Sequence, residues 1–563
     1  MKILVLGAYG IFGTRLCQLL VAHAELTLLV GGRNIAKAKA LCKQLAGPAA
    51  CEPMRVDRDN LQASDLQQMG AHIVIDASGP FQSYGATPYG VVQACLDAGV
   101  NYLDFADGAD FVDGIASFNA EAQQRGVFIL SGVSSFPVLT AAVVRVLSED
   151  MHTVQSIRGG IAPSPFAVVG ENVIRAIAGY AGQPLQLTRK GKASSGYALT
   201  ESCSYTIAPP GYMPLHPTHF SLVEVPDLLV LPKLWPAISD VWMGAGPVPE
   251  ILHRMLNGLA YLVRLRVLPT LRPLSPLFFY AIKYLRWGEH RGGMFVEVRG
   301  LAIGGQALHR SWHLLAEGED GPYIPCMALQ AVVHKVLARQ APPPGARAAC
   351  GDVGLADYMV LFAKRTIYAG VREHAASDQP SGLFKLLLGN AFERLPPSLQ
   401  AAHQAGKQMA LSGQATVQRG SGLLARGIAT LFGFPKAAQG VDVRVHMERH
   451  GLTEEWTRTF GTQSFSSTLS SGSAKSQWLL VEKFGPFRFH MALVVTNEKL
   501  HWVVRGGTLW GMNLPKFLLP GGDSYEHEVQ GRFHFHVDIR HPLVGLIVAY
   551  DGWLHPVDAN ADA

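Results

Sequence analysis

The sequence has few cysteines, and they follow no recognisable pattern. They are odd in number, and no Cys-x-x-Cys pair occurs among Cys17, Cys42, Cys51, Cys95, Cys203, Cys326 and Cys350. This distribution supports neither a disulfide framework nor a zinc site built on thiolates. We therefore expect a cytoplasmic protein without a bound metal.

A strong excess of charge of one sign is also missing. The formal net charge is +5 over 563 residues, and charged residues make up 16% of the chain. So small an imbalance gives no sign of a nucleic-acid partner. The first apolar run, residues 2–6, is too short for a secretory leader because Gly7 ends it.

No apolar run is long enough to cross a bilayer. The nearest candidate is 250–287, which is rich in Leu, Val, Phe and Tyr but is interrupted by Arg254, Arg264, Arg266, Arg272, Lys283 and Arg286. A spanning helix needs roughly 18 consecutive apolar residues. Two alternatives remain for 250–287: helices at a hydrophobic domain interface, or a basic amphipathic helix pair in peripheral contact with a membrane.

Residues 1–131 alternate short apolar strands with helical patterns. The expected strands are 2–6, 26–30, 72–76, 101–105 and 127–131, with a further strand at 54–57, and the expected helices lie near 11–23, 35–46, 88–98 and 114–125. This alternation of strands and helices predicts a parallel sheet that helices cover on both faces, as in an α/β Rossmann domain.

Two further domains are expected after residue 131. Residues 132–371 predict an α+β substrate domain, with a hairpin at 294–318 around Gly304 and Gly305 and a Pro-rich boundary at 341–345. The polar segment 372–381 predicts a linker. Residues 382–557 predict a separate β-rich domain with an antiparallel sheet, because apolar residues alternate in segments such as 441–447 and 531–539.

A glycine-rich loop follows the first strand and opens the first helix. It consists of Gly7, Ala8, Tyr9, Gly10, Ile11, Phe12 and Gly13. Glycines at these positions permit the tight turn, the approach of a pyrophosphate and the packing of helix on strand. The free N–H groups of the helix would bind the phosphates. The alternative is a glycine-rich turn without a nucleotide.

The second strand ends at Gly31-Gly32-Arg33-Asn34, where an NAD site usually has an acidic residue. A guanidinium at Arg33 suits a ribose 2′-phosphate, so we expect NADP(H), with Asn34 beside it. The alternative is a surface arginine that caps the next helix. Ser78, Gly79 and Pro80, after another strand, and Asp57 are expected to complete the cofactor site.

No catalytic group stands out. A Tyr-x-x-x-Lys pair is absent from the positions where a short-chain reductase has one, and a role in the fold is favoured for Tyr84, Tyr102, Asp104 and Asp107. His534 and His536 are expected on a solvent face rather than at a metal.

The aromatic residues of the β-rich part have two interpretations, as core residues or as the lining of an apolar ligand site: Phe465, Trp478, Phe484, Phe487, Phe489, Trp502 and Trp510.

Several of these motifs resemble the NADP-binding domain of the saccharopine dehydrogenase-like family. They are GAYGIFG, GGRN, ASGPF and ACLDAGVNYLDFADG, with SGVSSFP (131–137) and EDGPYIP (319–325) similar to later segments. The resemblance covers about the first 350 residues. It implies a Rossmann fold, NADP(H), and a substrate domain inserted before the chain returns to the first domain.

The C-terminal part is similar to a domain of unknown function, of the DUF4166 type, that is fused to such proteins. The similar pieces are FERLPPSLQ (392–400), RGSGLLAR (419–426), LVEKFGPF (480–487) and HPLVGLIVAYDGWL (541–554). This resemblance implies a fusion protein and no particular chemistry.

The arginines between 132 and 345 cluster in 250–291 instead of spreading over a site for two carboxylates. Saccharopine is therefore not the expected substrate. We expect an NADP(H)-dependent oxidoreductase with a hydrophobic small-molecule substrate. The alternative is a dinucleotide-binding sensor, or a scaffold that binds a hydrophobic ligand, without hydride transfer. The sequence is also compatible with a homo-oligomer.

Overall fold

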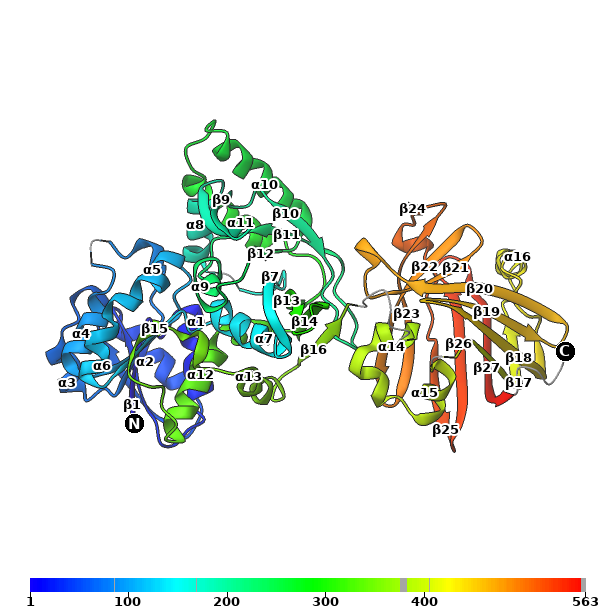
Figure 1. Cartoon of the computed structure of the whole chain (residues 1–563), viewed down its shortest axis with the longest axis horizontal. Coiled ribbons are helices and arrows are strands. Elements are labelled where there is room, and N and C mark those ends of the chain that lie inside the picture. The colour runs from blue at the N-terminus through cyan, green and yellow to red at the C-terminus, as the bar shows by residue number, and fades with distance from the viewer. Residues whose placement is uncertain (86, 169, 375–381, 405, 558–563) are drawn as a thin grey trace. The chain divides into compact units, whose positions relative to one another are not determined.

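The computed structural model describes residues 1–85, 87–168, 170–374, 382–404 and 406–557 (Figure 1). The chain divides into two compact units. The first consists of 1–203 and 218–368, and the second consists of 204–217 and 369–563. The predicted fold classes are confirmed: a Rossmann domain, a second domain with a mixed sheet and a β-rich C-terminal part.

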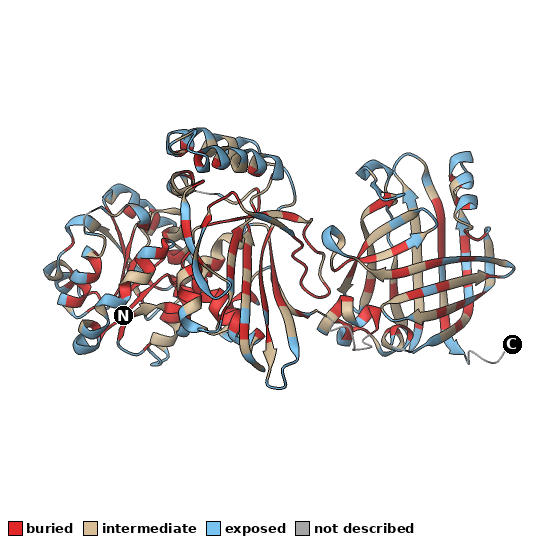
Figure 2. Ribbon diagram, turned by 45° about the horizontal axis from the view of Figure 1, so that its top comes forward, coloured by how far each residue is buried: buried red, intermediate tan, exposed pale blue. Residues whose placement is uncertain are grey.

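The first sheet of unit 1 is parallel, in the order β15-β6-β5-β4-β1-β2-β3. Its strands are β1 (Lys2–Leu6), β2 (Thr27–Gly32), β3 (Ala50–Arg55), β4 (Ile73–Asp76), β5 (Asn101–Asp104), β6 (Phe128–Ser131) and β15 (Gly345–Ala348). The central strands are almost wholly apolar and buried, because helices cover both faces of the sheet (Figure 2). The last strand of this sheet in sequence, β15, joins it after the chain has formed all but one strand of a second sheet.

Helices of this domain include α1 (Ile11–Leu20), α2 (Ile35–Gln44), α3 (Ala63–Met69), α4 (Gly90–Ala98), α5 (Ala109–Gly114), α6 (Asn119–Arg125) and α12 (Ile324–Leu337). The prediction of a strand at 54–57 is wrong in its bounds. The strand is β3, at 50–55, and Asp57 begins a short 3₁₀ helix, Arg58–Asn60, instead.

The second sheet of unit 1 is mixed, in the order β10-β11-β12-β7-β13-β14-β16. Its strands are β7 (Met151–Ala162), β10 (Ser202–Tyr205), β11 (Thr218–Leu222), β12 (Asp240–Ala245), β13 (Arg291–Ala302), β14 (Ala307–Glu317) and β16 (Ile367–Glu373), the edge strands β10 and β16 crossing the boundary between the units. The predicted hairpin is confirmed: β13 and β14 are antiparallel, and Gly305 in their turn has a φ of +79°.

Helices accompany this second sheet. They are α7 (Thr140–Leu147), α8 (Glu171–Tyr180), α9 (Asp227–Leu234), α10 (Glu250–Arg264), α11 (Ser275–Tyr284) and α13 (Leu355–Phe362), and a small hairpin, β8 (Pro184–Arg189) and β9 (Lys192–Tyr197), lies beside them. In α10 the buried residues recur at His253, Ala260 and Val263.

Unit 2 is built on one antiparallel sheet that closes on itself, because β22 pairs with both β21 and β23. Its strands are β17 (Gln408–Arg419), β18 (Ala438–His450), β19 (Thr453–Phe460), β20 (Gln463–Ser471), β21 (Leu480–Phe484), β22 (Phe487–Thr496), β23 (Lys499–Leu509), β24 (Met512–Asn513), β25 (Tyr525–Val529), β26 (Arg532–His541) and β27 (Gly545–Val557). Helices α14 (Leu383–Leu388), α15 (Pro397–His403) and α16 (Leu423–Leu431) accompany it.

The interior of this closed sheet is occupied by side chains. Phe384 from α14 is fully buried, and its ring centroid lies 3.9 Å from that of His403 and 5.6 Å from that of Trp502. The interpretation of the aromatic residues as core therefore holds for Phe465, which is buried, and for Phe484 and Trp502, which pack against the buried core. It is wrong for Trp510, which is 75% exposed because it lies in the turn between β23 and β24.

The two units cut across the predicted domain bounds. Residues 204–217 belong to unit 2, where the backbone N–H of Val495 donates to the Gly211 carbonyl at 2.9 Å. The predicted linker begins inside β16, since Arg372 and Glu373 are strand residues. His374 follows the strand, and 375–381 lie outside the described residues.

Candidate functional site

The loop between β1 and α1 needs its glycines for steric reasons. Gly7 has a φ of +70°, and a Cβ there would lie 2.8 Å from the Ala77 carbonyl oxygen. A Cβ on Gly13 would lie 2.4 Å from the carbonyl oxygen of Gly7. The loop therefore packs directly against the start of α1 and the turn after β4, and leaves no room for side chains at these positions.

Gly10 is the N-terminal cap of α1 and has no side chain to satisfy the first N–H groups of the helix. These groups are available to an anion. Of the predicted loop residues, Gly7, Tyr9, Gly10, Ile11 and Phe12 line the adjoining cavity. Ala8 and Gly13 are buried beneath them and shape the loop.

Arg33 and Asn34 lie in the turn after β2 and have different roles. The side-chain oxygen of Asn34 accepts hydrogen bonds from the backbone N–H groups of Ala36 and Lys37, at 3.0 and 3.1 Å, and so caps α2. Arg33 is exposed and lines the cavity. The alternative in which Arg33 caps the helix is excluded, because Asn34 is the cap.

The turn after β4 is organised by a carboxylate. Asp76 is fully buried, and it accepts hydrogen bonds from the backbone N–H of Ser78 at 2.9 Å and from the Ser78 hydroxyl. Its other oxygen lies 3.5 Å from Nε of Arg58 and accepts from the Tyr84 hydroxyl at 3.3 Å. Ser78, Gly79 and Pro80 are thereby held on the cavity wall.

Arg58 is a cavity residue that the sequence did not indicate. Its guanidinium carbon lies 3.3 Å from the centroid of the Tyr84 ring, which fixes the guanidinium beside the turn after β4. Asp57, two residues past β3, lines the cavity and also accepts a hydrogen bond from the Asn60 side chain at 3.1 Å.

Of the four weak acid candidates, Tyr102 and Asp104 are buried parts of the fold, and Tyr84 is half-buried on the cavity wall. Burial raises the pKa of Tyr84 and of Tyr102 above the ordinary range of a phenol. Asp104 is fully buried and accepts from the backbone N–H groups of Ala106 and Gly132, and burial raises its pKa to about 7. Asp107 differs, because its exposed side chain faces the cavity, whose walls desolvate it and raise its pKa.

A single cavity of about 1400 Å³ within unit 1 joins the glycine loop to the second domain. At the second-domain end its walls are largely apolar. They include Ile174, Ile177, Val248, Leu256, Phe278, Ile282, Met294 and Leu314. A cavity of this size and lining is typical of a small-molecule site.

Glu224 follows β11. Of the polar side chains that line the cavity, its carboxyl group is the best suited to act as an acid. It accepts a hydrogen bond from the backbone N–H of Ala109 at 2.8 Å and lines the cavity. Burial raises its pKa to about 7, and the charges of Asp107 and Asp110 add to this. Tyr180, at the end of α8, lines the same cavity, and its pKa is raised by burial and then by the charge of Glu224.

His253 of α10 is a further polar residue on the second-domain side. It is 3% exposed, and burial lowers its pKa to about 4, with a further contribution from His219. The imidazole is therefore neutral. The sequence could not indicate Glu224, Tyr180 or His253, since they stand in no motif and meet only through the folding of β11, α8 and α10.

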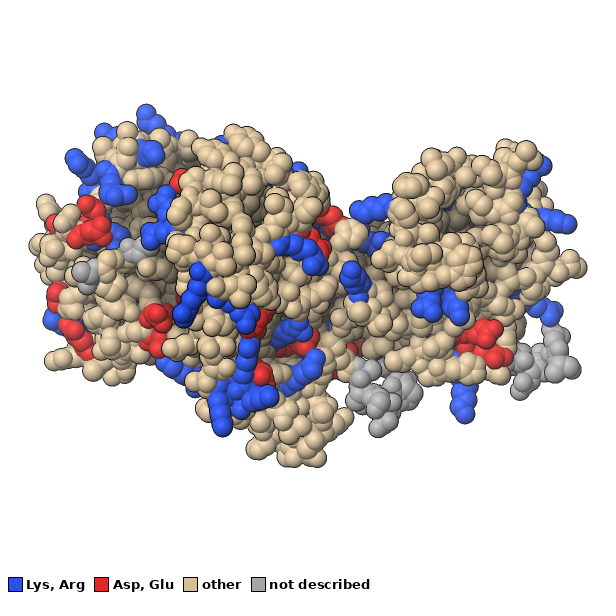
Figure 3. Space-filling view, turned by 90° about the horizontal axis from the view of Figure 1, so that it is seen from above, with Lys and Arg blue, Asp and Glu red and all other residues tan. Residues whose placement is uncertain are grey.

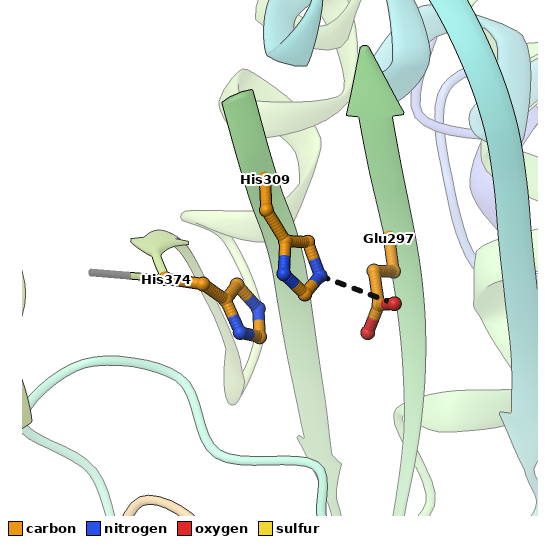
Figure 4. A group of neighbouring side chains, drawn as sticks. All are labelled: Glu297, His309 and His374. Atoms are coloured by element: carbon orange, nitrogen blue, oxygen red, sulfur yellow. Dashed lines mark ion pairs between the residues drawn. The ribbon is translucent and has the colours of Figure 1, made fainter. Parts of the chain in front are cut away.

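Two groups of titratable side chains lie outside this cavity, one in unit 2 and one in unit 1. His536 forms an ion pair with Asp551 on the neighbouring strand β27. On the second sheet, Glu297 is 5% exposed and lies 3.1 Å from Nε2 of His309 (Figure 4). Figure 4 also draws His374, which belongs to unit 2.

Among the described residues, no helix is both long enough and apolar enough to cross a membrane. The segment 250–287 instead forms α10, α11 and their connection.

The comparisons with known proteins agree with this architecture. Residues 3–130 match the saccharopine dehydrogenase NADP binding domain, and residues 395–554 match a domain of unknown function, DUF4166. No curated protein matches the chain.

Several solved structures are similar at low identity. Saccharopine dehydrogenase (L-Glu forming) from Saccharomyces cerevisiae is 14% identical, with a TM-score of 0.49, and the match covers 66% of this chain and 100% of that one. The WlbA (WbpB) dehydrogenase from Thermus thermophilus, in complex with NAD and alpha-ketoglutarate, is 12% identical, with a TM-score of 0.28 and coverage of 61% and 90%.

The fold and the loop together define a dehydrogenase-like NAD(P)-binding protein. More particularly, the chain has a saccharopine dehydrogenase NADP-binding domain at its N-terminus and a DUF4166 domain at its C-terminus.

Proposed function

We propose that the protein is an NADP(H)-dependent oxidoreductase that acts on an apolar small molecule. The observation that carries this proposal is the continuous cavity of about 1400 Å³, which has the glycine loop at one end and apolar side chains at the other. Such a cavity can hold a dinucleotide and a substrate in one space, which is the arrangement that hydride transfer requires.

The residues at the loop fit the cofactor. Gly7 and Gly13 let the loop pack tightly against the turn after β4 and against α1, and Gly10 leaves the first N–H groups of α1 without a side-chain cap, so they are free to bind a pyrophosphate. Arg33 has no acidic partner among the residues that the structure describes, and its guanidinium suits a 2′-phosphate. Bound at this loop, the nicotinamide cofactor would supply or accept a hydride.

The other end of the cavity fits an apolar substrate better than a dicarboxylate. The arginines that line the cavity are Arg15, Arg33 and Arg58, and all three come from the Rossmann domain. The second domain contributes apolar side chains with Glu224, Tyr180 and His253 among them. An amino-dicarboxylate would need cations at this end, because its carboxylates would otherwise be buried without partners.

Glu224 is suited to move a proton during the reaction. With a pKa of about 7 it is protonated in a substantial fraction of molecules near neutral pH. In the direction of reduction its carboxylic acid would donate a proton to the substrate oxygen, and in oxidation its carboxylate would accept one. The nearby phenol of Tyr180 would help to orient the substrate oxygen.

The test uses the intact chain, first for binding of NADPH and then for turnover of aldehydes and alcohols of increasing chain length. We expect NADPH binding, and oxidation or reduction that improves with apolar chain length. If NADPH binds and no substrate of this class is turned over, while Glu224→Gln leaves binding unchanged, the alternative of a dinucleotide sensor replaces this proposal. If no dinucleotide binds, both proposals fail.

A further inference from the structure

Helix α10 carries apolar side chains on two opposite faces. Its inner face buries His253, Ala260 and Val263 against the rest of unit 1. Its outer face exposes Ile251 and Met255, which are 59% and 63% exposed and one turn apart. A helix that is apolar on both faces is normally buried on both.

Helix α11 and the connection between the helices also expose apolar side chains. Leu277, Tyr280 and Tyr284 of α11 are spaced to share one side of the helix and are 54–70% exposed. In the connection, Leu265 and Val267 are 67% and 65% exposed. Twelve of the large hydrophobic side chains that are exposed among the described residues lie within 250–287, whereas exposed hydrophobic residues on a surface are ordinarily scattered singly. Figure 2 shows much of the ribbon at the top of unit 1 as exposed.

The segment that carries this outer face is basic, and most of its basic side chains are exposed. The segment 250–287 contains six basic residues, Arg254, Arg264, Arg266, Arg272, Lys283 and Arg286, and one acidic residue, Glu250. Glu250 is paired with Arg254 at 2.7 Å. Figure 3 looks onto the side of the molecule on which α10 lies in Figure 1, and draws the Lys and Arg side chains of that side in blue.

The same two helices form part of the cavity wall. His253 and Leu256 of α10, and Phe278 and Ile282 of α11, line the cavity from the inner face. One layer of helices therefore separates the apolar cavity from the exposed apolar face.

We propose that the outer face of α10, α11 and residues 265–274 docks on a lipid bilayer that contains anionic headgroups. Exposed aliphatic side chains would enter the headgroup region, and basic side chains would meet the lipid phosphates. Tyr261, Tyr280, Tyr284 and Trp287 supply the amphipathic rings that are enriched at membrane interfaces. Helices of 15 and 10 residues lie in the interface plane rather than across it.

This docking would place an apolar cavity next to its supply of apolar molecules. The inference rests on the exposed face and its charge, and does not depend on the proposed reaction. Binding to vesicles and turnover can therefore fail separately.

The experiment measures co-sedimentation of the full chain with phosphatidylcholine vesicles, with and without phosphatidylglycerol. We expect binding that requires the anionic lipid and weakens as salt is raised. The double variant Met255→Glu/Leu277→Glu should bind at least about tenfold more weakly, because charges replace two exposed apolar anchors. Arg266→Ala/Arg272→Ala should lose most of the preference for anionic lipid.

The matched control is Ile303→Glu/Val360→Glu, which places the same charges at two exposed apolar positions elsewhere in unit 1. It should bind vesicles as the unmodified chain does, and all variants should bind NADPH normally, which shows that they are folded. Absence of vesicle binding, or equal loss in the control, overturns the proposal. So does a dimer in sedimentation velocity that Met255→Glu/Leu277→Glu converts to a monomer, since the face would then be covered by a second copy.

Discussion

The hydroxyl of Tyr9 accepts a hydrogen bond from the backbone N–H of Asn34, 2.9 Å away. The same ring lies over Gly32, where a Cβ would come within 2.5 Å of it. The loop after β1 is thus attached to the turn after β2. Since Asn34 also caps α2, the residues on both sides of Arg33 are held in place, and this fixes the backbone of Arg33 at the cavity.

The first prediction concerns the glycine loop. Gly10→Val should abolish binding of either dinucleotide, because a branched side chain at the start of α1 would occupy the space that the pyrophosphate needs. The measurement is calorimetric titration with NADPH, accompanied by thermal unfolding to establish that the variant is folded.

Gly90→Val provides the control, since Gly90 begins α4 in the same domain and has open space around it. It should bind NADPH as the unmodified chain does. Normal binding by a folded Gly10→Val variant would show that the loop is not the phosphate site.

The sequence predicted those parts of the site that depend on local structure. Strand, loop and helix are consecutive at Gly7–Gly13, so their spacing alone placed the loop, and Arg33 followed from its position after β2. Glu224 and Tyr180 could not be predicted from the sequence. Their position at the cavity depends on how β11 and α8 pack, and no local pattern encodes that packing. The same holds for residues 204–217, which pair with a unit that begins more than 150 residues later.

The second prediction is a pH dependence that follows from the pKa of Glu224, which is about 7. If its carboxylic acid donates the proton in reduction, kcat should be constant below pH 7 and should fall about tenfold per pH unit above it. In oxidation the carboxylate is the active form, so kcat should instead rise through the same pH range.

Glu224→Gln should lower kcat by about 100-fold or more and remove this pH dependence, with little change in NADPH affinity. The control is Glu149→Gln, at an exposed position away from the cavity. An unchanged pH profile in Glu224→Gln would exclude Glu224 as the proton donor.

The third prediction concerns stability. The folded state holds the proton of Asp104 up to about pH 7, whereas the unfolded chain releases it near pH 4. This residue therefore contributes stability below pH 4 that is lost as the pH rises to 7, by up to about 4 kcal/mol. In Asp104→Asn the free energy of unfolding of unit 1 should fall less steeply between pH 4 and 7.

Asp227 and Glu224, whose pKa values are also raised to about 7, remain in that variant and should preserve part of the slope. Asp97→Asn, on the exposed side of α4, should leave the full slope unchanged. Equal slopes for the unmodified chain and Asp104→Asn would contradict the account of Asp104.

The fourth prediction concerns Arg372, which ties residues 204–217 into unit 2. It is 4% exposed and donates to the carbonyl oxygens of Ala208, at 2.5 Å, and Leu387, at 2.7 Å. Arg372→Met should destabilise unit 2 by about 2–4 kcal/mol, because both buried acceptors lose a charged donor. Denaturant unfolding followed by tryptophan fluorescence would measure this loss.

Arg488→Met, at an exposed position of β22, should change the stability of unit 2 by less than about 0.5 kcal/mol. A small effect of both substitutions would mean that unit 2 folds without its first segment. The predicted independent domain at 382–557 would then hold as the sequence defined it.

The most direct test of the account is the cofactor preference and its dependence on Arg33. Titration calorimetry of the intact chain should show tighter binding of NADPH than of NADH, because the guanidinium pairs with the 2′-phosphate. Arg33→Asp should remove or reverse the preference by deleting an interaction of about 1.5–3 kcal/mol, while Lys39→Asp, the same charge change at an exposed position of α2, should keep it. Equal affinities of the unmodified chain for the two cofactors would contradict an NADP(H) site at this cavity.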